Sequence, residues 1–367
     1  MQKPLLRTVA MSLLLLAIGP ASADTELDQL VEQAGVKAGD VAMRDRPGWT
    51  EPRKIIVRDI PGFYDVVAGS TPGIELVRVR TEDEALRHAV DADAIMGFCS
   101  ERLVAAAPKV MWMQIFSAGA DRCLALERVA SGDIVLTNMQ KMSSPVIAEH
   151  VTALVLALAR NLGPYSKAMA AGDWQRGSGM TSGMQSIGGK TVLVLGLGGI
   201  GTESARRLAA LDMSVLATRR SSREGPEFVD YVGLSSERFE LAAQADFIVN
   251  ALPLTAETTG ILDAEFFAAA KRGAHFVNVG RGKTVVTSDL VAALESGQIA
   301  GAGLDVTDPE PLPRDHALWQ MSNVIVTPHV AGRGGNRIRH GILAKENLRR
   351  FVAGDALLNV VNPELGY

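Results

Sequence analysis

Cysteine is scarce in this chain, and its scarcity narrows the kinds of site that the chain can build. The 367 residues contain only Cys99 and Cys123, which show neither a metal-ligand spacing nor a redox spacing. The sequence therefore predicts no metal site. Two buried free thiols are the expected state of the pair, with a disulfide between them as the alternative.

Runs of basic residues are also lacking. The formal net charge is −4 and no lysine–arginine cluster occurs, so nucleic acid is not expected as a partner. Apolar residues make up 47% of the chain and charged residues 21%, which is typical of a globular protein. The length is sufficient for two domains, each with its own core.

Long apolar runs are absent except at the N-terminus. Lys3 and Arg7 precede an apolar run over residues 8–19, and Ala21-Ser22-Ala23 ends it with small residues. This order is typical of a secretory signal peptide that is cleaved before Asp24, and it predicts an exported protein, periplasmic or secreted.

Two alternatives to export stay open. An uncleaved segment would anchor the protein to a membrane, and a start at Met11 or Met43 would leave it in the cytoplasm. The apolar run is short for a membrane span, and no other segment approaches the necessary length. No membrane contact is therefore expected beyond this segment.

Apolar strand-like segments alternate with helix-like segments along the remaining chain, which predicts an α/β protein with parallel sheets and helical crossovers. Helices are expected at residues 27–34, 82–90, 145–160, 202–211 and 335–352. Strands are expected at residues 54–58, 74–79, 92–96, 110–116, 134–138, 191–195, 213–218, 246–250, 274–279, 301–306 and 323–326.

A glycine-rich turn follows the strand expected at residues 191–195. Gly196, Gly198 and Gly201 form a Gly-x-Gly-x-x-Gly sequence that also includes Gly199 and Ile200, and a helix is expected directly afterwards. The first glycine allows a tight turn, the second lets the backbone approach a pyrophosphate, and the third lets helix and strand pack closely. This strand–turn–helix order predicts a dinucleotide site.

Three polar residues follow three different strands of the same unit, namely Arg281, Glu310 and His329. They are expected at the sheet edge that carries the glycine-rich turn. A histidine can exchange a proton near neutral pH, and a neighbouring carboxylate orients it and favours its protonated form. An arginine can bind a substrate carboxylate with two hydrogen bonds. The set predicts the interconversion of a 2-keto acid and a 2-hydroxy acid.

The other histidines do not lie at the end of an expected strand. His88, His150 and His340 fall in expected helices, His275 falls at a strand start, and His316 follows a proline-rich loop. A structural role is the prediction for these five residues.

From residue 54 to 355 the chain resembles the D-isomer-specific 2-hydroxyacid dehydrogenases. Several separate motifs carry the resemblance: Ser117-Ala118-Gly119-Ala120-Asp121, Ala148-Glu149-His150, Gly188-Gly189-Lys190, the glycine-rich turn, Leu252-Pro253-Leu254-Thr255, Asn278-Val279-Gly280-Arg281-Gly282, Asp305-Val306, Glu310-Pro311 and Thr327-Pro328-His329.

The resemblance implies a role for each of these motifs. Arg281 would bind the substrate carboxylate and keto oxygen, His329 would give the proton, and Glu310 would support His329. Substrate would also meet backbone N–H groups of Gly97, Phe98, Cys99, Ala118 and Gly119. The implied cofactor contacts are the glycine-rich turn, Thr218, Arg219, Arg220, Leu252, Pro253, Thr258, Val279, Gly280, Arg281, Asp305 and His329.

The resemblance also implies the architecture, which is two Rossmann-like domains around a cleft that closes on substrate. We assign residues 1–23 to the signal peptide and residues 147–333 to the dinucleotide-binding domain. Residues 24–146 and 334–367 form the substrate domain, which is flavodoxin-like and completed by the C-terminal helix.

One departure from the usual cofactor site concerns the second strand of the dinucleotide-binding domain. An NAD site has an acidic residue at the end of this strand, whereas this chain has Arg219 and Arg220. Arginine would attract the 2′-phosphate that an acid would repel. The sequence therefore favours NADP(H), with NAD(H) as the alternative.

Export of an unfolded chain conflicts with a cytoplasmic cofactor, so two non-catalytic classes are weighed against an enzyme. One is a two-lobed ligand-binding protein, and the other is a dinucleotide-sensing scaffold like the corepressors that resemble this family. The trio Arg281, Glu310 and His329 disfavours both, because a binder needs no proton donor.

The sequence shows no clear phosphate clamp in the substrate domain, which favours a small unphosphorylated keto acid. Phe98, Trp112 and Met113 are candidates to shape its pocket. The family resemblance implies a homodimer, with the arm at residues 163–189 as its contact. The Gly/Ser/Met-rich run at 177–189 within this segment is either a surface loop or the part that packs on a second subunit.

Overall fold

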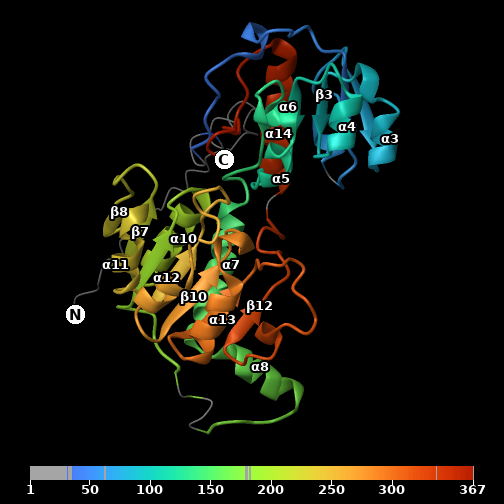
Figure 1. The fold of residues 1–367 in the computed structure, drawn as a ribbon. Coiled ribbons are helices and arrows are strands. Elements are labelled where there is room, and N and C mark those ends of the chain that lie inside the picture. Colours follow the sequence, from blue (N-terminus) through green and yellow to red (C-terminus); the bar gives the residue numbers. More distant parts are fainter. Residues whose placement is uncertain are drawn as a thin grey trace, which may run out of the picture.

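A computed structural model describes residues 31, 35–61, 63–177, 181, 183–335 and 337–366. The expected signal peptide lies outside these residues, as does the expected helix at 27–34 apart from Val31. The described chain forms two α/β domains, one above the other in Figure 1, each built around its own parallel sheet.

The first domain contains five parallel strands in the order β2-β1-β3-β4-β5. The strands are β1 (Lys54–Arg58), β2 (Glu75–Val79), β3 (Ala94–Met96), β4 (Trp112–Gln114) and β5 (Val135–Thr137). Strands β3, β4 and β5 are buried throughout, as expected where helices cover both faces of a sheet. This order is the flavodoxin-like one, so the implied architecture of the domain is confirmed.

The helices of the first domain lie on both sides of this sheet. They are α2 (Tyr64–Val67), α3 (Glu82–Leu86), α4 (Glu101–Ala106), α5 (Asp121–Leu124), α6 (Glu127–Ala130) and the C-terminal α14 (Arg337–Ala353). The N-termini of α3 and α4 are capped by side-chain oxygens, since Thr81 accepts from Glu84 N–H and Ser100 accepts from Leu103 N–H.

Helix α14 returns from the second domain to pack on the first sheet. Its Phe351 ring contacts Trp112, with 5.0 Å between ring centroids. Its buried Asn347 donates to Gln114 Oε1 at 3.0 Å and accepts from Leu358 N–H at 2.7 Å. These buried bonds fix the helix on the sheet, so residues from the C-terminal end complete the first domain.

The second domain contains seven parallel strands in the order β12-β11-β10-β9-β6-β7-β8. The strands are β6 (Thr191–Leu195), β7 (Ser214–Arg219), β8 (Tyr231–Leu234), β9 (Phe247–Asn250), β10 (Ala274–Asn278), β11 (Ile299–Leu304) and β12 (Val324–Val326). Strands β6 to β11 have the Rossmann order, and β12 extends the sheet beside β11.

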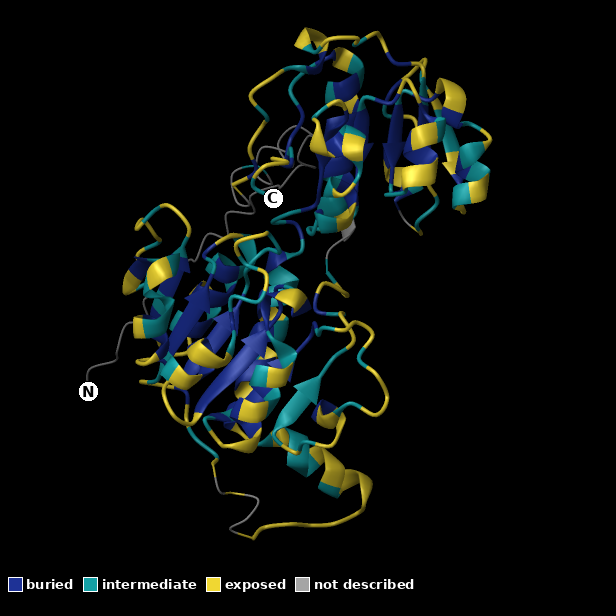
Figure 2. Cartoon of the chain, in the orientation of Figure 1, coloured by how far each residue is buried: buried dark blue, intermediate teal, exposed yellow. Residues whose placement is uncertain are grey.

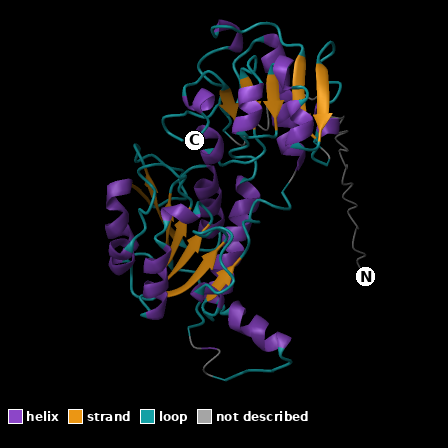
Figure 3. Ribbon diagram, turned by 45° about the vertical axis from the view of Figure 1, so that its right-hand side comes forward, coloured by secondary structure: helices purple, strands orange, loops and turns teal. Residues whose placement is uncertain are grey.

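Alternate residues of this sheet enter two separate cores. Val192 and Val194 belong to the core under α7 (Ser144–Ala159) and α10 (Gly199–Ala209). Leu193 and Leu195 belong to the core under α11 (Arg238–Ala242), α12 (Ala264–Ala269) and α13 (Thr287–Glu295). Figure 3 shows helices on both sides of the strands, and Figure 2 shows that the central strands are buried.

Some elements differ from the sequence prediction. Strand β8 was not expected, because Gly233 and the exposed Tyr231 weaken its apolar pattern at the sheet edge. Helix α8 (Leu162–Ala170) was not expected either; it covers the start of the segment 163–189 and ends before the run 177–189. None of its residues is buried.

No single helix among the described residues is long and apolar enough to cross a membrane. Helices α7 and α8 together meet a test of length and composition, but they are bent by 77° relative to each other. Seven of the α7 side chains are buried in the protein.

Candidate active site

The carboxyl ends of the second sheet bring the predicted catalytic residues to one edge. Arg281 follows β10, Glu310 follows β11 and His329 follows β12, and these three strands are adjacent. The glycine-rich turn follows β6 at the same edge, because all the strands run in parallel. The edge predicted from the sequence is therefore present.

His329 and Glu310 form a direct pair. His329 Nδ1 lies 2.7 Å from Glu310 Oε1, and the two side chains are 49% and 43% exposed. An ionised carboxylate only accepts hydrogen bonds, so Nδ1 carries the hydrogen. The other ring nitrogen, Nε2, is left for a proton exchange with a substrate. This pairing is the one that the family resemblance implied.

Asp305 holds the loop on which His329 lies. Its carboxylate accepts from Thr327 Oγ1–H at 2.7 Å, from Val330 N–H at 2.9 Å and from Ala331 N–H at 3.0 Å. Only 3% of Asp305 is exposed, and three donors offset the cost of burying its charge. The resemblance implied a cofactor contact for Asp305; the structure shows these loop bonds.

The backbone of His329 has an uncommon conformation. Its φ is +52°, in the left-handed region that residues other than glycine seldom adopt. The bonds from Asp305 on both sides of the residue hold this conformation, and His329 N–H donates to the Asp305 carbonyl at 2.8 Å. The imidazole is therefore presented from a fixed turn rather than from a loose loop.

Arg281 reaches from the second domain to the first. Its Nε donates to Asp121 Oδ1 at 3.2 Å and its Nη1 donates to the Gly280 carbonyl at 2.8 Å. A Cβ at Gly119 would lie 1.3 Å from Arg281 Nη2, so only glycine leaves room for the guanidinium. The predicted substrate loop at residues 117–121 and the predicted arginine are in contact.

The second predicted substrate loop ends strand β3. Gly97 has a φ of +93°, and a Cβ there would lie 2.4 Å from Phe116 Cε2. Phe98 is 8% exposed and belongs to a hydrophobic core. The Arg58 guanidinium lies over its ring, 5.2 Å from the ring centroid. Phe98 therefore fixes the loop in place. Gly97 N–H already donates to the Gln114 carbonyl at 2.7 Å, so the N–H groups of Phe98 and Cys99 are the ones left for the predicted role.

The prediction that Trp112 and Met113 shape the pocket is wrong. Both side chains are fully buried in strand β4, and the Trp112 indole donates to Thr137 Oγ1 at 2.8 Å. They lie within the two cores that flank the sheet. A strand that is buried on both faces has no side chain left to face a ligand.

The expectation of two free thiols is also wrong. Cys99 and Cys123 form a disulfide with 5.4 Å between their Cα atoms, within the usual range for such a bond. The two residues meet because β3 and β4 are neighbours in the sheet and each cysteine follows one of them. The 24-residue separation in sequence carried no indication of this contact.

The glycine-rich turn has the geometry that a dinucleotide pyrophosphate requires. Gly196 has a φ of +91°, and a Cβ at Gly201 would lie 2.0 Å from the Gly196 carbonyl oxygen. Nothing lies within 4 Å of a Cβ position at Gly198, so that face is open. Helix α10 begins at Gly199 and directs its first N–H groups towards the open face. Ile200 packs on the core behind it.

The end of strand β7 is basic. Arg219 Nη2 donates to the Leu197 carbonyl at 3.1 Å, whereas its Nε is buried and has no hydrogen-bond partner among the described residues. The Arg219 guanidinium is thus held next to the glycine-rich turn, where its charge attracts an anion such as a phosphate. Thr218 is 3% exposed, and its hydroxyl is 3.4 Å from Gly196 N. These observations fit a phosphate-bearing cofactor.

Two further predicted cofactor segments lie against each other. A Cβ at Gly280 would lie 2.6 Å from the Leu252 carbonyl oxygen, so the turns after β9 and β10 are in close contact. Val279 N–H donates to the Asn250 carbonyl at 3.1 Å. Thr258 Oγ1 donates to the Pro253 carbonyl at 2.7 Å and closes the segment after β9. Val279 and Gly280 shape this edge through their main chains, and Thr258 does so through its hydroxyl.

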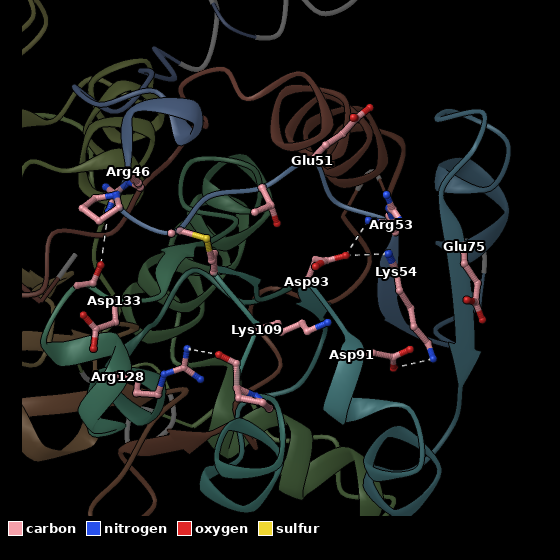
Figure 4. Close-up of a pocket in the computed structure, with 16 residues that line it drawn as sticks. Arg46, Glu51, Arg53, Lys54, Glu75, Asp91, Asp93, Lys109, Arg128 and Asp133 are labelled. Carbon is pink, nitrogen blue, oxygen red and sulfur yellow. Dashed lines mark hydrogen bonds and ion pairs between the residues drawn. The ribbon is translucent and has the colours of Figure 1, made fainter.

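A large hollow lies away from this edge, at the amino ends of the first sheet (Figure 4). Its volume is about 1060 Å³, and charged side chains of both signs line it. Several of these charges already have partners: Lys54 pairs with Asp91 at 2.9 Å, and Asp93 accepts from Lys54 N–H at 2.9 Å. The hollow contains none of the predicted site residues.

The fold and the site define a dinucleotide-dependent oxidoreductase with a histidine–carboxylate pair and an arginine. The family model of the D-isomer specific 2-hydroxyacid dehydrogenase NAD-binding domain matches residues 152–331. The chain belongs to the D-isomer specific 2-hydroxyacid dehydrogenase family. Its members are NAD(P)-dependent oxidoreductases.

Individual relatives agree with this assignment. A glyoxylate reductase of Pyrococcus furiosus is 32% identical over 296 residues, which cover 77% of this chain and 86% of that protein. An uncharacterized protein of Corynebacterium melassecola is 43% identical over 180 residues, which cover 48% of this chain and 59% of that protein.

A solved structure gives the same result for the fold. An NADPH-dependent glyoxylate/hydroxypyruvate reductase of Sinorhizobium meliloti, in complex with NADP and sulfate, superposes with a TM-score of 0.74 at 29% identity. The superposition covers 86% of this chain and all of that one.

Proposed function

We propose that this protein reduces a small, unphosphorylated 2-keto acid, such as glyoxylate or hydroxypyruvate, to the D-2-hydroxy acid with NADPH. The observation that carries the proposal is the His329–Glu310 pair at 2.7 Å, on the same sheet edge as Arg281 and the glycine-rich turn. The substrate names come from the glyoxylate reductase relative and the glyoxylate/hydroxypyruvate reductase structure.

Each residue has a distinct part in this proposal. Arg281 binds the substrate carboxylate and polarises the keto oxygen, for which its planar guanidinium is suited. His329 Nε2 holds the proton that the keto oxygen receives, while Glu310 favours the protonated ring and fixes its orientation. The main-chain N–H groups of residues 98–99 and 118–119 contact the carboxylate from the first domain.

The nicotinamide cofactor supplies the hydride that the keto carbon receives. Gly196, Gly198 and Gly201 give its pyrophosphate access to the start of α10. Arg219, held beside the glycine-rich turn by its bond to the Leu197 carbonyl, and Arg220 attract the 2′-phosphate of NADP(H). This arrangement supports NADP(H) as the preferred cofactor, and NAD(H) is the alternative.

A non-catalytic sensor on the same fold would also bind a dinucleotide. Such a protein has no use for a proton donor, yet His329 is paired with Glu310 and its loop is held by Asp305. This construction favours the enzyme over the sensor. The sensor would become the better account if cofactor binding were retained without turnover.

The test is a steady-state assay of the mature chain with NADPH and NADH on a panel of 2-keto acids. We expect turnover of glyoxylate or hydroxypyruvate, with a lower KM for NADPH than for NADH. An absence of turnover across the panel, while NADPH still binds, would favour the sensor and overturn the proposed reaction.

We also propose that the protein is exported after cleavage before Asp24. The support is the order of charged, apolar and small residues at 1–23. N-terminal sequencing of protein from the cell envelope or medium is expected to begin at Asp24. Full-length protein in the cytoplasmic fraction would contradict export.

A homodimer is proposed through the segment that contains α8. Its Met169 and Trp174 are 75% and 88% exposed, so both side chains are accessible for packing against a second copy of the chain. We expect a dimer in sedimentation at micromolar concentration, and Trp174→Ser is expected to weaken it. A monomeric wild-type chain would rule the dimer out.

A further inference from the structure

The disulfide joins the two loops to which the proposed function assigns the substrate carboxylate. Cys99 ends the loop after β3, directly after Gly97 and Phe98, and Cys123 lies in α5, directly after the loop at residues 117–121. The bond therefore connects two segments that separate strands deliver to the site. The inference below rests on the proposed function.

Each loop is otherwise held by its own surroundings. Ser100 caps α4 and donates to Glu82 Oε1 at 2.7 Å, which ties the first loop to α3. Asn138 donates to the Ala118 carbonyl at 2.7 Å, which ties the second loop to the end of β5. No hydrogen bond between described residues joins 97–100 to 117–124 directly. Apart from apolar packing, the Cys99–Cys123 disulfide is therefore what connects these two described segments directly.

The second loop also sets the position of the proposed substrate-binding arginine. Asp121 accepts from Arg281 Nε at 3.2 Å and lies two residues before Cys123 in the same helix, α5. A helix of four residues has little stability of its own. Its position depends on what anchors it, and Cys123 is an anchor that is 3% exposed.

We propose that the Cys99–Cys123 disulfide is a positioning element of the substrate site. It holds the main-chain N–H groups of both loops in one arrangement, and through Asp121 it holds Arg281. Both cysteines are positioning residues, since neither is required to touch the reacting atoms. Opening the bond is expected to weaken keto-acid binding and to leave NADPH binding unchanged, because the glycine-rich turn lies in the other domain.

The bond forms when the two thiols lose two protons and two electrons. The electron acceptor would be the disulfide of an exchange partner, which is reduced to two thiols as the protein disulfide forms. Disulfides form and persist in oxidising compartments. The proposed export would therefore place the chain where its substrate site is complete, and reduced protein would have a poorly ordered site.

The test compares the oxidised chain with the same chain after reduction by dithiothreitol, with free thiols counted by alkylation and mass. We expect reduction to raise the KM for glyoxylate or hydroxypyruvate by roughly ten- to a hundredfold, as for a small misplacement of binding groups. The Kd for NADPH should change by less than about twofold (under about 0.4 kcal/mol), because the glycine-rich turn lies in the other domain. Reoxidation should restore the KM.

The matched control is the double variant Cys99→Ser/Cys123→Ser. Its KM should equal that of the reduced chain and should not respond to dithiothreitol. An unchanged KM in fully reduced wild-type protein would overturn the proposal, and this arm does not depend on whether the variant folds. A variant with the KM of the oxidised chain would also overturn it.

A second readout separates this proposal from the proposed function. Oxamate, an amide analogue of a 2-keto acid, is titrated calorimetrically into the NADPH-loaded chain in both redox states. Weaker oxamate binding after reduction supports the positioning role even if no keto acid turns over. Equal binding in both states contradicts the positioning role, whereas absent turnover in both states contradicts only the proposed reaction.

Discussion

The two ends of the seven-stranded sheet each contain a histidine, and the two side chains have opposite properties. His329, at the carboxyl end, is 49% exposed and paired with Glu310. His275, near the amino end of β10, is 7% exposed, and its ring is stacked on Phe247 with 5.0 Å between centroids. Burial lowers the pKa of His275 to about 4.

The surroundings explain the difference. At the amino end, carboxylates bind the starts of strands: Asp246 accepts from Thr191 N–H at 3.0 Å, and Asp230 accepts from Val215 N–H at 2.8 Å. Polar groups there are used within the fold. At the carboxyl end, the turns leave Arg281, Glu310 and His329 partly exposed, and α10 directs N–H groups outwards. Polar groups with partly exposed side chains therefore gather at the carboxyl end, next to structural ones such as the buried Asp305.

The largest expected effect comes from removing the exposed histidine. His329→Ala should lower kcat for the keto acid by about 10²- to 10⁴-fold, the usual contribution of a general acid. The Kd for NADPH and the Tm should stay close to those of the wild type, since the side chain is half exposed. Steady-state kinetics, cofactor titration and thermal unfolding measure the three quantities.

The buried histidine provides the matched control. His275→Leu should leave kcat unchanged, because His275 lies at the opposite end of the strand from Arg281. If folded His275→Leu lost activity, or if His329→Ala kept the wild-type kcat, the assignment of a structural role to His275 and of proton donation to His329 would be wrong.

The next effect is on the pH dependence of stability. The pKa of His275 is about 4 in the folded state and about 6.5 in the unfolded state, so between these values the unfolded state binds more protons. The free energy of unfolding therefore falls as pH drops from 6.5 to 4, by about 3 kcal/mol for this group. Denaturant unfolding at several pH values should show a steeper decline for the wild type than for His275→Leu. Parallel curves would contradict the burial account.

A glycine substitution tests the cofactor turn without disturbing the fold. Gly198→Ala meets no atom within 4 Å, so its Tm should be unchanged, yet the methyl group would obstruct a pyrophosphate. We expect the Kd for NADPH to rise roughly ten- to a hundredfold, or about 1.4–2.8 kcal/mol. Gly177→Ala, equally open but in the segment after α8, should bind NADPH normally. Equal affinity in both variants would place the cofactor elsewhere.

The smallest expected effect concerns the choice of cofactor. Arg219→Asp replaces an attractive charge with a repulsive one beside the proposed 2′-phosphate. It should weaken NADPH binding roughly tenfold and shift preference towards NADH, in line with the modest energy of a charged hydrogen bond. Titration of wild type and variant with NADPH and with NADH measures this shift. An unchanged ratio of the two Kd values would show that Arg219 does not contact the 2′-phosphate.

Much of the fold could be predicted because it follows from local pattern. The buried strands are short apolar runs, and the glycine-rich turn has a fixed relation to the strand before it and the helix after it. Strand ends were less exact: β4 covers Trp112–Gln114 rather than 110–116. A strand buried on both faces has no alternation, so the directions of Trp112 and Met113 could not be predicted.

The site was predicted in its residues but not in all its connections. Arg281, Glu310 and His329 could be found because each follows a strand. The role of Asp121 and the disulfide depend on contacts between separate loops, and no local pattern indicates either. Cys99 and Cys123 had no recognisable spacing, so only the neighbouring positions of β3 and β4 in the sheet brought them together.

The most direct test of the central claim follows the hydrogen atom. Hydroxypyruvate is incubated with the protein and with NADPH that is deuterated at the transferring position, and the product is analysed by mass and chirality. We predict the D-isomer of the hydroxy acid with one deuterium at the former keto carbon, and at least about 10²-fold less of this product from His329→Ala after the same incubation. Product without deuterium, or the L-isomer, would contradict the proposed reaction.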